Sequence, residues 1–149
     1  MSIHLPSIGE CRSIDARLPD SGSDSSRLSV FENGRQVPFA VNRAFLIHTD
    51  RSTTRGHHAH RRCSQALICV AGTCEVTVDD GRNRKQIALS GPDRGVLVPA
   101  GIWAEQRYKL RGTILMVLCD LRYDEDDYIR DYEEFLRYRA AYAPVASVS

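Results

Sequence analysis

The stretch Arg55-Gly56-His57-His58-Ala59-His60 decides how this chain is interpreted. On a β-strand, side chains two positions apart point to the same face, so His58 and His60 should project together into whatever that face encloses. His57 should face the other way. A His-x-His pair by itself also fits a solvent-exposed edge or histidines with a structural role. The surrounding sequence is needed to choose between these alternatives.

Short apolar segments broken by turn residues surround the motif. The segments Arg43–His48 and Gln65–Ala71 contain continuous apolar runs, typical of strands buried on both faces. Residues 74–79 alternate between apolar and polar before the turn signal Asp80-Gly81. Further candidate strands are residues 28–32 (before the turn at 33–34), 87–89, 95–98, 102–108 and 113–121. About eight short strands with no helix between them predict an all-β sandwich or barrel.

The end of the chain has a different period. Positions i, i+4, i+7 and i+8 of one helical stripe are occupied by Tyr128, Tyr132, Phe135 and Leu136. Acidic residues crowd the first turns, and Arg137 and Arg139 lie near the end, as the helix dipole favours. We expect one C-terminal helix whose aromatic stripe packs on the outside of the β-domain.

A chain of 149 residues fits one domain. Residues 18–27 are rich in Ser, Gly and Asp, which indicates a loop. We therefore expect an irregular lead-in over residues 1–27, a single domain over 28–141 that includes the helix, and a frayed tail over 142–149.

Charge and cysteine content exclude several classes of protein. Twenty Lys and Arg balance 19 Asp and Glu, with no long basic run, which argues against nucleic-acid and membrane-surface partners. No secretory signal is visible and no apolar stretch approaches about 18 residues, so we expect a cytoplasmic protein. The five cysteines are odd in number and lack a C-x-x-C pair, so neither a disulfide framework nor a thiolate zinc site is indicated.

The spacing of His58, His60, Gln65 and Gly72 resembles the first motif of the cupin superfamily, and residues 99–104 resemble the second. This resemblance implies a cupin jelly-roll β-barrel with one C-terminal α-helix. A metal-binding cupin usually offers a Glu and a third His where this chain has Gln65 and Ala104. An amide is a weak ligand and a methyl group is none, so we expect no metal and no other cofactor.

Imidazoles without a metal act through protonation. Histidine titrates near pH ~6.5, so a pair in the mouth of a barrel suits proton transfer. Abstraction of a proton next to a carbonyl fits such a base. This suggests a lyase, epimerase or isomerase that acts through an enediol or enolate.

A closer resemblance covers roughly residues 28–139. Its segments, in chain order, are Val37-Pro38-Phe39 with Arg43, residues 55–61 with Gln65, Asp79-Asp80-Gly81, Trp103, and residues 123–135. In combination they resemble the dTDP-4-keto-6-deoxyglucose 3,4-ketoisomerases, the WxcM-like cupins of bacterial deoxysugar pathways.

The resemblance implies a metal-free and commonly dimeric jelly roll that moves a keto group from C4 to C3 of a dTDP-linked 6-deoxyhexose. His58 and His60 correspond to the histidines that carry the chemistry. Substrate contacts are expected from Arg43, Arg55, Arg61, Gln65 and Trp103. Guanidinium groups suit a diphosphate and an enediolate because they offer a planar fork of donors. Each arginine could instead be a solvated surface charge. Trp103 could instead have a core or interface role.

The chain departs from the family pattern where members carry polar groups, and Ser25-Ser26, Phe45 and Ala104 stand at those places. Each change removes a side chain that could bind a sugar oxygen. Three rival functions therefore stay open: a non-catalytic or diverged cupin that binds a nucleotide sugar, an epimerase on a related keto sugar, and a metal-dependent oxygenase or isomerase.

Overall fold

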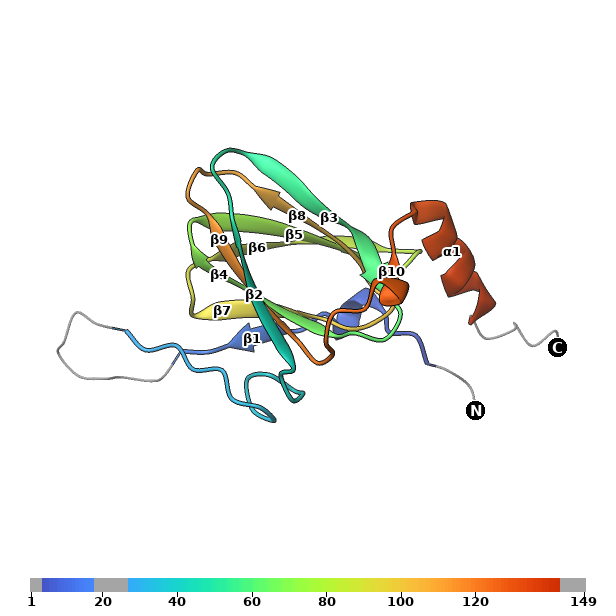
Figure 1. The fold of residues 1–149 in the computed structure, drawn as a ribbon, viewed down its shortest axis with the longest axis horizontal. Coiled ribbons are helices and arrows are strands. Elements are labelled where there is room, and N and C mark those ends of the chain that lie inside the picture. Colours follow the sequence, from blue (N-terminus) through green and yellow to red (C-terminus); the bar gives the residue numbers. More distant parts are fainter. Residues whose placement is uncertain (1–3, 18–26, 143–149) are drawn as a thin grey trace.

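The computed structural model describes residues 4–17 and 27–142, which form two facing antiparallel sheets and one helix (Figure 1). The strands are β1 (Ser13–Asp15), β2 (Arg43–His48), β3 (Thr53–His60), β4 (Gln65–Ala71), β5 (Thr73–Asp79), β6 (Arg84–Ser90), β7 (Arg94–Val98), β8 (Trp103–Tyr108), β9 (Ile114–Cys119) and β10 (Tyr128–Ile129). Helix α1 spans Tyr132–Ala141, and two short 3-10 helices span Ile8–Glu10 and Glu125–Asp127. One sheet has the order β1-β7-β4-β9-β2 and the other β10-β3-β8-β5-β6. The expected all-β class with one C-terminal helix is confirmed.

The main core fills the space between the two sheets. Leu67 of β4, Val76 of β5 and Leu115 of β9 are among its most buried members. A second apolar cluster, which includes Ala66 and Ile68, lies on the opposite face of β4. Strand β4 is therefore buried on both faces, as its continuous apolar run predicts.

Strand β2 is not buried on both faces as β4 is, although it also contains a continuous apolar run. It lies at the edge of its sheet, and its residues alternate between partly buried and exposed. Leu46 is 53% exposed. The expectation that Arg43–His48 is buried on both faces was wrong, because nothing among the described residues covers the outer face of this edge.

Two further expectations are corrected at the N-terminal side. Residues 28–32 form no strand and make a single isolated bridge, Ser29 with Arg17. Conversely, β1 lies inside the segment expected to be irregular, where it pairs with β7 and buries Ile14. Most of the loop expected at 18–27, and the tail beyond residue 142, lie outside the described residues.

Helix α1 packs on the outer face of one end of the second sheet, near β10, and so lies outside the β-domain as expected (Figure 1). Phe135 is fully buried against Ala59 of β3, Trp103 of β8 and Ile129 of β10. The Asp131 carboxylate caps the helix by accepting a hydrogen bond of 2.8 Å from the Glu134 amide. Tyr128, expected on the helical stripe, belongs instead to β10, because residues 128–129 pair with the end of β3.

No helix among the described residues has the length and apolar character needed to cross a membrane.

A β-bulge in β3 sets which of its side chains face the core. Gly56 pairs with Glu105 and His58 pairs with Ala104, so His57 is an extra residue on this strand. Gly56 and His57 both have positive φ, at 89° and 57°. Because one residue is added, Arg55 and His58 line the same cavity although they are three positions apart.

The bulge requires glycine at position 56 for two reasons. Its φ of 89° is one that only glycine adopts freely. A Cβ there would also lie 2.8 Å from the Ala104 carbonyl oxygen and 2.9 Å from Gln106 Oε1. The backbone carbonyl cannot move without disturbing the pairing of β3 with β8.

We predict that Gly56→Ala lowers the free energy of unfolding by about 3 kcal/mol or more, the sum of backbone strain and a clash with β8. Gly91→Ala is the matched control, because Gly91 has a φ of 85° but no heavy atom within 4 Å of the new Cβ. We expect it to cost about 1–2 kcal/mol, the strain alone. Urea unfolding of both variants checks this, and equal losses would contradict the packing argument.

Candidate functional site

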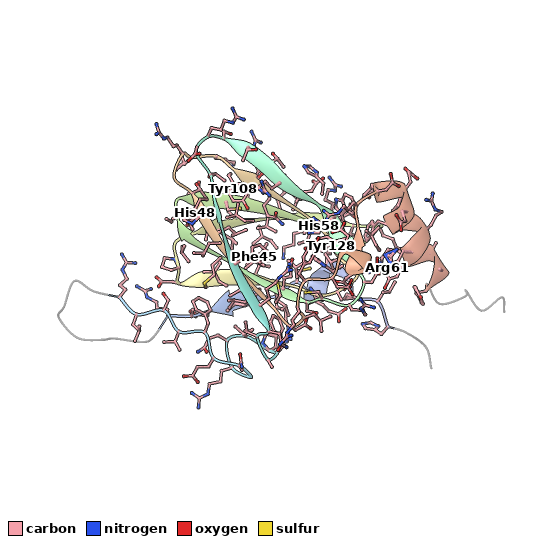
Figure 2. The ribbon with its side chains drawn as sticks, viewed as in Figure 1. Phe45, His48, His58, Arg61, Tyr108 and Tyr128 are labelled. Carbon is pink, nitrogen blue, oxygen red and sulfur yellow. The ribbon has the colours of Figure 1, made fainter. Side chains whose placement is uncertain are left out.

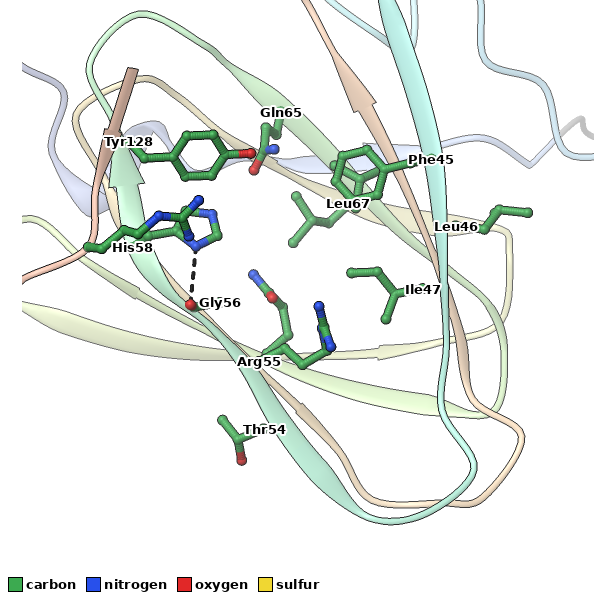
Figure 3. Close-up of a pocket in the computed structure, with 13 residues that line it drawn as sticks. Phe45, Leu46, Ile47, Thr54, Arg55, Gly56, His58, Gln65, Leu67 and Tyr128 are labelled. Carbon is green, nitrogen blue, oxygen red and sulfur yellow. Dashed lines mark hydrogen bonds between the residues drawn. The ribbon is translucent and has the colours of Figure 1, made fainter. Parts of the chain in front are cut away.

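A cavity of about 620 Å³ lies between the two sheets, and its walls come from both (Figure 3). Its volume falls in the range of small-molecule sites, roughly 300–1,000 Å³. Apolar walls are provided by Phe45, Ile47, Leu67 and Val117, and the cavity also borders Leu46, whose side chain points to the other face of β2. The polar lining is provided by Thr54, Arg55, His58, Gln65, Gln106, Tyr128 and Arg130. Polar groups that converge beside an apolar wall are what fixes the orientation of a ligand in such a site.

His58 faces this cavity as a neutral imidazole (Figures 2 and 3). Its Nδ1 lies 3.1 Å from the Gly56 carbonyl oxygen. A carbonyl only accepts, so Nδ1 carries the proton and Nε2 keeps its lone pair. Burial, followed by the nearby His60, lowers the pKa of His58 to about 4. At neutral pH the ring is therefore an unprotonated base.

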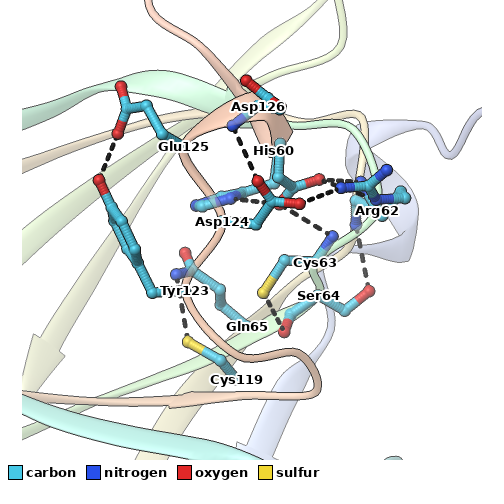
Figure 4. A network of polar contacts seen from close by, with 12 residues as sticks. His60, Arg62, Cys63, Ser64, Gln65, Cys119, Tyr123, Asp124, Glu125 and Asp126 are labelled. Carbon is cyan, nitrogen blue, oxygen red and sulfur yellow. Dashed lines mark hydrogen bonds and ion pairs between the residues drawn. The ribbon is translucent and has the colours of Figure 1, made fainter.

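His60 lies beside His58, as the strand alternation predicts, with 5.0 Å between the ring centroids. It is more deeply buried, at 6% exposure, and stands behind the cavity wall. Its Nδ1 is 2.9 Å from Asp127 Oδ2, within a polar network shown in Figure 4. Burial lowers the pKa of His60, and the hydrogen bond to Asp127 opposes that shift.

Tyr128 and Arg130 are cavity residues that the sequence analysis did not identify. Tyr128 stands directly opposite His60 in the pairing of β10 with β3. Its ring centroid is 4.4 Å from that of His60 and 5.0 Å from that of His58. The Arg130 guanidinium lies 4.2 Å from the Tyr128 centroid and forms two 3.0 Å hydrogen bonds to Glu125. The alternation of side chains in Tyr128-Ile129-Arg130 could have predicted a strand with Tyr128 and Arg130 on one face. Tyr128 also fits the period of the C-terminal helix, which was the interpretation chosen.

Gln65 and Arg43 meet at Cys119 in β9. Cys119 Sγ accepts a 3.5 Å contact from Gln65 Nε2 and a 3.7 Å contact from Arg43 Nη2. The Arg43 guanidinium also lies 5.0 Å from the Phe45 ring. Hydrogen bonds from Cys63 and Gln65, with the Arg43 charge, lower the pKa of Cys119 to about 6 against the effect of burial. Gln65 lines the cavity, whereas Arg43 stands behind Phe45.

Arg61 and Trp103, two expected substrate contacts, lie on the far face of the sheet under α1. Arg61 Nη2 forms a 2.7 Å ion pair with Glu134, and its guanidinium lies over Tyr138. Trp103 packs against Tyr132 and Phe135, with ring centroids 5.2 Å and 5.6 Å apart. Both side chains hold the helix on the sheet and do not line the cavity.

The residues present do not fit a metal ion. Donor atoms of His60, Cys63 and Asp127 lie within 4.8 Å of one another. The Asp127 oxygens already accept backbone N–H groups of Arg62 and Cys63 at 2.6 Å and 3.3 Å. The interaction with Cys119, reinforced by burial, raises the pKa of Cys63, so this sulfur stays a thiol and a poor ligand. His60, Cys63 and Asp127 therefore do not form a metal site.

Comparison with known proteins identifies close relatives. Residues 11–140 match the family model FdtA, described as WxcM-like, C-terminal. A TDP-4-oxo-6-deoxy-alpha-D-glucose-3,4-oxoisomerase from Aneurinibacillus thermoaerophilus is 37% identical over 114 residues, which is 76% of this chain and 82% of the relative.

Solved structures agree with this match. A 3,4-ketoisomerase from Helicobacter canadensis has a TM-score of 0.80 at 35% identity, covering 92% of this chain and 99% of that one. A histidine-to-asparagine mutant of the 3,4-ketoisomerase QdtA from Thermoanaerobacterium thermosaccharolyticum, in complex with TDP-4-keto-6-deoxyglucose, has a TM-score of 0.80 at 26% identity. It covers 94% of this chain and 98% of that one.

We predict that the buried His58 makes the fold sensitive to acid. Its pKa falls from 6.5 when unfolded to about 4 when folded, so the unfolded chain binds the proton first. The stabilisation is present above pH ~6.5 and is lost as the pH falls toward 4, by about 3 kcal/mol at ~1.4 kcal/mol per pKa unit. Urea unfolding between pH 7 and pH 4 measures this loss.

His58→Asn should remove that part of the pH dependence, so that the difference in unfolding free energy between the variant and the native protein shrinks toward pH 4. His48→Asn is the control, because His48 is an exposed residue of β2. A pH dependence that His58→Asn leaves unchanged would show that this imidazole is not buried in its neutral form.

Proposed function

The chain belongs to the FdtA (WxcM-like, C-terminal) family, and from that membership we propose that it is a nucleotide-sugar 3,4-ketoisomerase. It moves the keto group of a dTDP-4-keto-6-deoxyhexose from C4 to C3. One observation carries the proposal: a neutral imidazole with a free Nε2, that of His58, faces a cavity of sugar size. The oxoisomerase name of the Aneurinibacillus relative supports the reaction class.

The reaction needs one proton to move between carbons and one between oxygens. His58 Nε2 removes the proton from C3, which is acidic because it is adjacent to the C4 carbonyl. The electrons shift to O4 and give an enediolate. A proton then moves from O3 to O4, and the electrons left on O3 form the C3 carbonyl as the proton held by the base returns at C4. These proton transfers require a base that is neutral at physiological pH before the reaction starts.

Tyr128 is suited to the oxygen-to-oxygen step. Its ring touches both imidazoles and its side chain lines the cavity. A phenol both donates and accepts a hydrogen bond, so it can pass a proton between O3 and O4. We assign it this role beside His58, with His60 behind both.

Arginines at the cavity supply positive charge for the substrate. Arg55 and Arg130 line the cavity and are exposed, which suits them to the diphosphate of a nucleotide sugar. Gln65 and Gln106 offer amide groups to sugar hydroxyls. Arg61 and Trp103 are left out of the proposed substrate contacts because both are engaged with α1.

Phe45 and Ala104 favour one alternative. Phe45 lines the cavity, and Ala104 is the partner of His58 in the adjacent strand. Both are apolar where the family resemblance leads us to expect polar side chains. A diverged cupin that binds a nucleotide sugar without turnover, or an epimerase on a related keto sugar, would also use this cavity. Hydrogen exchange and product analysis by NMR distinguish these outcomes from isomerisation.

We also propose a homodimer. The exposed edge of β2 carries Leu46 and has unpaired backbone groups, which a second copy of the chain could cover.

We predict that the protein exchanges the C3 hydrogen of dTDP-4-keto-6-deoxyglucose in deuterated buffer and forms the 3-keto product, both visible by NMR. His58→Asn should slow exchange by about 10²–10⁴-fold, the usual contribution of a general base. His57→Asn is the matched control, since His57 is exposed, faces outward and pairs with Glu105 at 2.9 Å.

The two rivals give different spectra. Exchange at C3 or C5 with inversion and no 3-keto product would identify an epimerase. Thermal stabilisation by dTDP with neither exchange nor product would reject the isomerase and favour the binding module.

Tyr128→Phe removes only a hydroxyl group. We predict that kcat falls about 10²-fold or more while KM changes little, because proton transfer between oxygens is impaired and the ring still packs on both imidazoles. Steady-state kinetics with Tyr142→Phe as the control, an exposed tyrosine at the end of α1, measure this. An unchanged kcat would remove Tyr128 from the mechanism.

A further inference from the structure

We propose that Asp127 is a positioning residue that holds His60 in its Nδ1–H tautomer, so that His60 Nε2 is kept as a buried proton acceptor behind the cavity wall. The catalytic consequence rests on the proposed function, whereas the tautomer does not. Four observations carry the inference: the hydrogen bond between the two side chains, the donors around the carboxylate, the anchoring of its loop, and the unpartnered nitrogen.

The hydrogen bond joins two buried groups. His60 Nδ1 lies 2.9 Å from Asp127 Oδ2, and the two side chains are 7% and 5% exposed. A solvent-exposed pair of this kind would contribute little, but a buried one is poorly screened and orients both partners. The bond therefore fixes the plane of the imidazole as well as the position of its proton.

Asp127 is surrounded by donors. The Arg62 amide donates to Oδ1 at 2.6 Å, and the Cys63 amide donates to Oδ2 at 3.3 Å. Arg62 Nε lies 3.8 Å from Oδ1. Backbone N–H groups only donate, so both oxygens of Asp127 act as acceptors. An ionised carboxylate only accepts, so His60 Nδ1 must carry the proton.

The loop that carries Asp127 is fixed at several points. The Arg61 amide donates to the Asp127 carbonyl oxygen at 2.8 Å, and the Asp127 amide donates to the Asp124 carbonyl oxygen at 3.1 Å. The Asp124 side chain caps the same 3-10 turn by accepting from the Asp126 amide at 3.0 Å. The carboxylate is thus held in place before any ligand enters the cavity.

The other nitrogen of His60 is buried and has no hydrogen-bond partner among the described residues. Leaving a buried polar atom unpaired costs about 1–3 kcal/mol, so such atoms are rare and tend to occur at functional sites. The titratable and charged groups that face the ring are His58 on the same strand, Arg43 on β2, Tyr128 on β10, Arg130 after it, and Cys63. With its proton fixed on Nδ1, Nε2 keeps a lone pair that can accept a proton from a donor that comes within hydrogen-bond distance.

Asp127→Asn reverses this arrangement with almost no change in volume. The amide oxygen would stay with the shorter contact, the Arg62 N–H at 2.6 Å, and the NH₂ group would face His60 Nδ1 and lose the longer 3.3 Å contact with the Cys63 N–H. An NH₂ group only donates, so Nδ1 would have to accept and the proton would move to Nε2. The ring would then present a donor where the native protein presents a lone pair.

The test is a long-range ¹H–¹⁵N correlation spectrum of ¹⁵N-histidine-labelled protein, without substrate. His60→Gln identifies the His60 signals. We expect a protonated Nδ1 and a lone pair on Nε2 in the native protein, and the opposite tautomer in Asp127→Asn. Asp126→Asn is the matched control: it is the neighbouring, exposed residue of the same 3-10 helix and should leave the spectrum unchanged.

Steady-state kinetics of the same variants are the second test. In Asp127→Asn we expect kcat to fall about 10²–10⁴-fold with KM within about threefold, as for a wrong tautomer in a catalytic pair. A native His60 with a protonated Nε2, an unchanged tautomer in Asp127→Asn, or an unchanged kcat would each overturn the inference. If the native protein shows no isomerase activity, the proposed function fails, and the spectrum of the native protein still decides the tautomer.

Discussion

The β-bulge at Gly56 and His57 is the constraint on which the site depends. A regular strand would place Arg55 and His58 on opposite faces, because they are three residues apart. The extra residue brings both to the cavity and leaves His57 outside with Glu105. Positive φ is unfavourable for His57, which is not a glycine, and the pairing of β3 with β8 on both sides of the bulge maintains it.

The two faces of the second sheet have different roles: the outer face packs against α1, and the inner face carries the residues of the candidate site. Ala59, Trp103 and Ile129 point outward and are covered by Phe135 of α1. Their neighbours along the strands, His58, His60 and Tyr128, point to the opposite, inner face, where their rings pack together. Packing of the helix therefore fixes the register of β10 against β3, and that register places Tyr128 opposite His60. Burial lowers the pKa of both imidazoles and keeps them neutral, since a charged ring would lose solvation.

Much of this could be predicted from the sequence. Alternation correctly placed His58 and His60 side by side, and the apolar runs located β2 and β4. What could not be predicted depends on contacts between distant segments. Tyr128 fits the period of a helix, and only its pairing with β3 makes it a strand residue. Arg61 and Trp103 have the chemistry of ligand-binding residues, but the position of α1 engages both. Asp127 is one of several acidic residues in a row, and only the fold shows that it is the buried one.

The central claim is that the free nitrogen of a neutral His58 removes the hydrogen from C3 of the sugar. A crystal structure of this protein with dTDP-4-keto-6-deoxyglucose bound in the cavity tests it most directly. The account predicts that C3 lies within about 3.5 Å of His58 Nε2, the distance of a reactive encounter. A sugar bound with C3 turned away from both imidazoles, toward the apolar wall at Phe45, would contradict it.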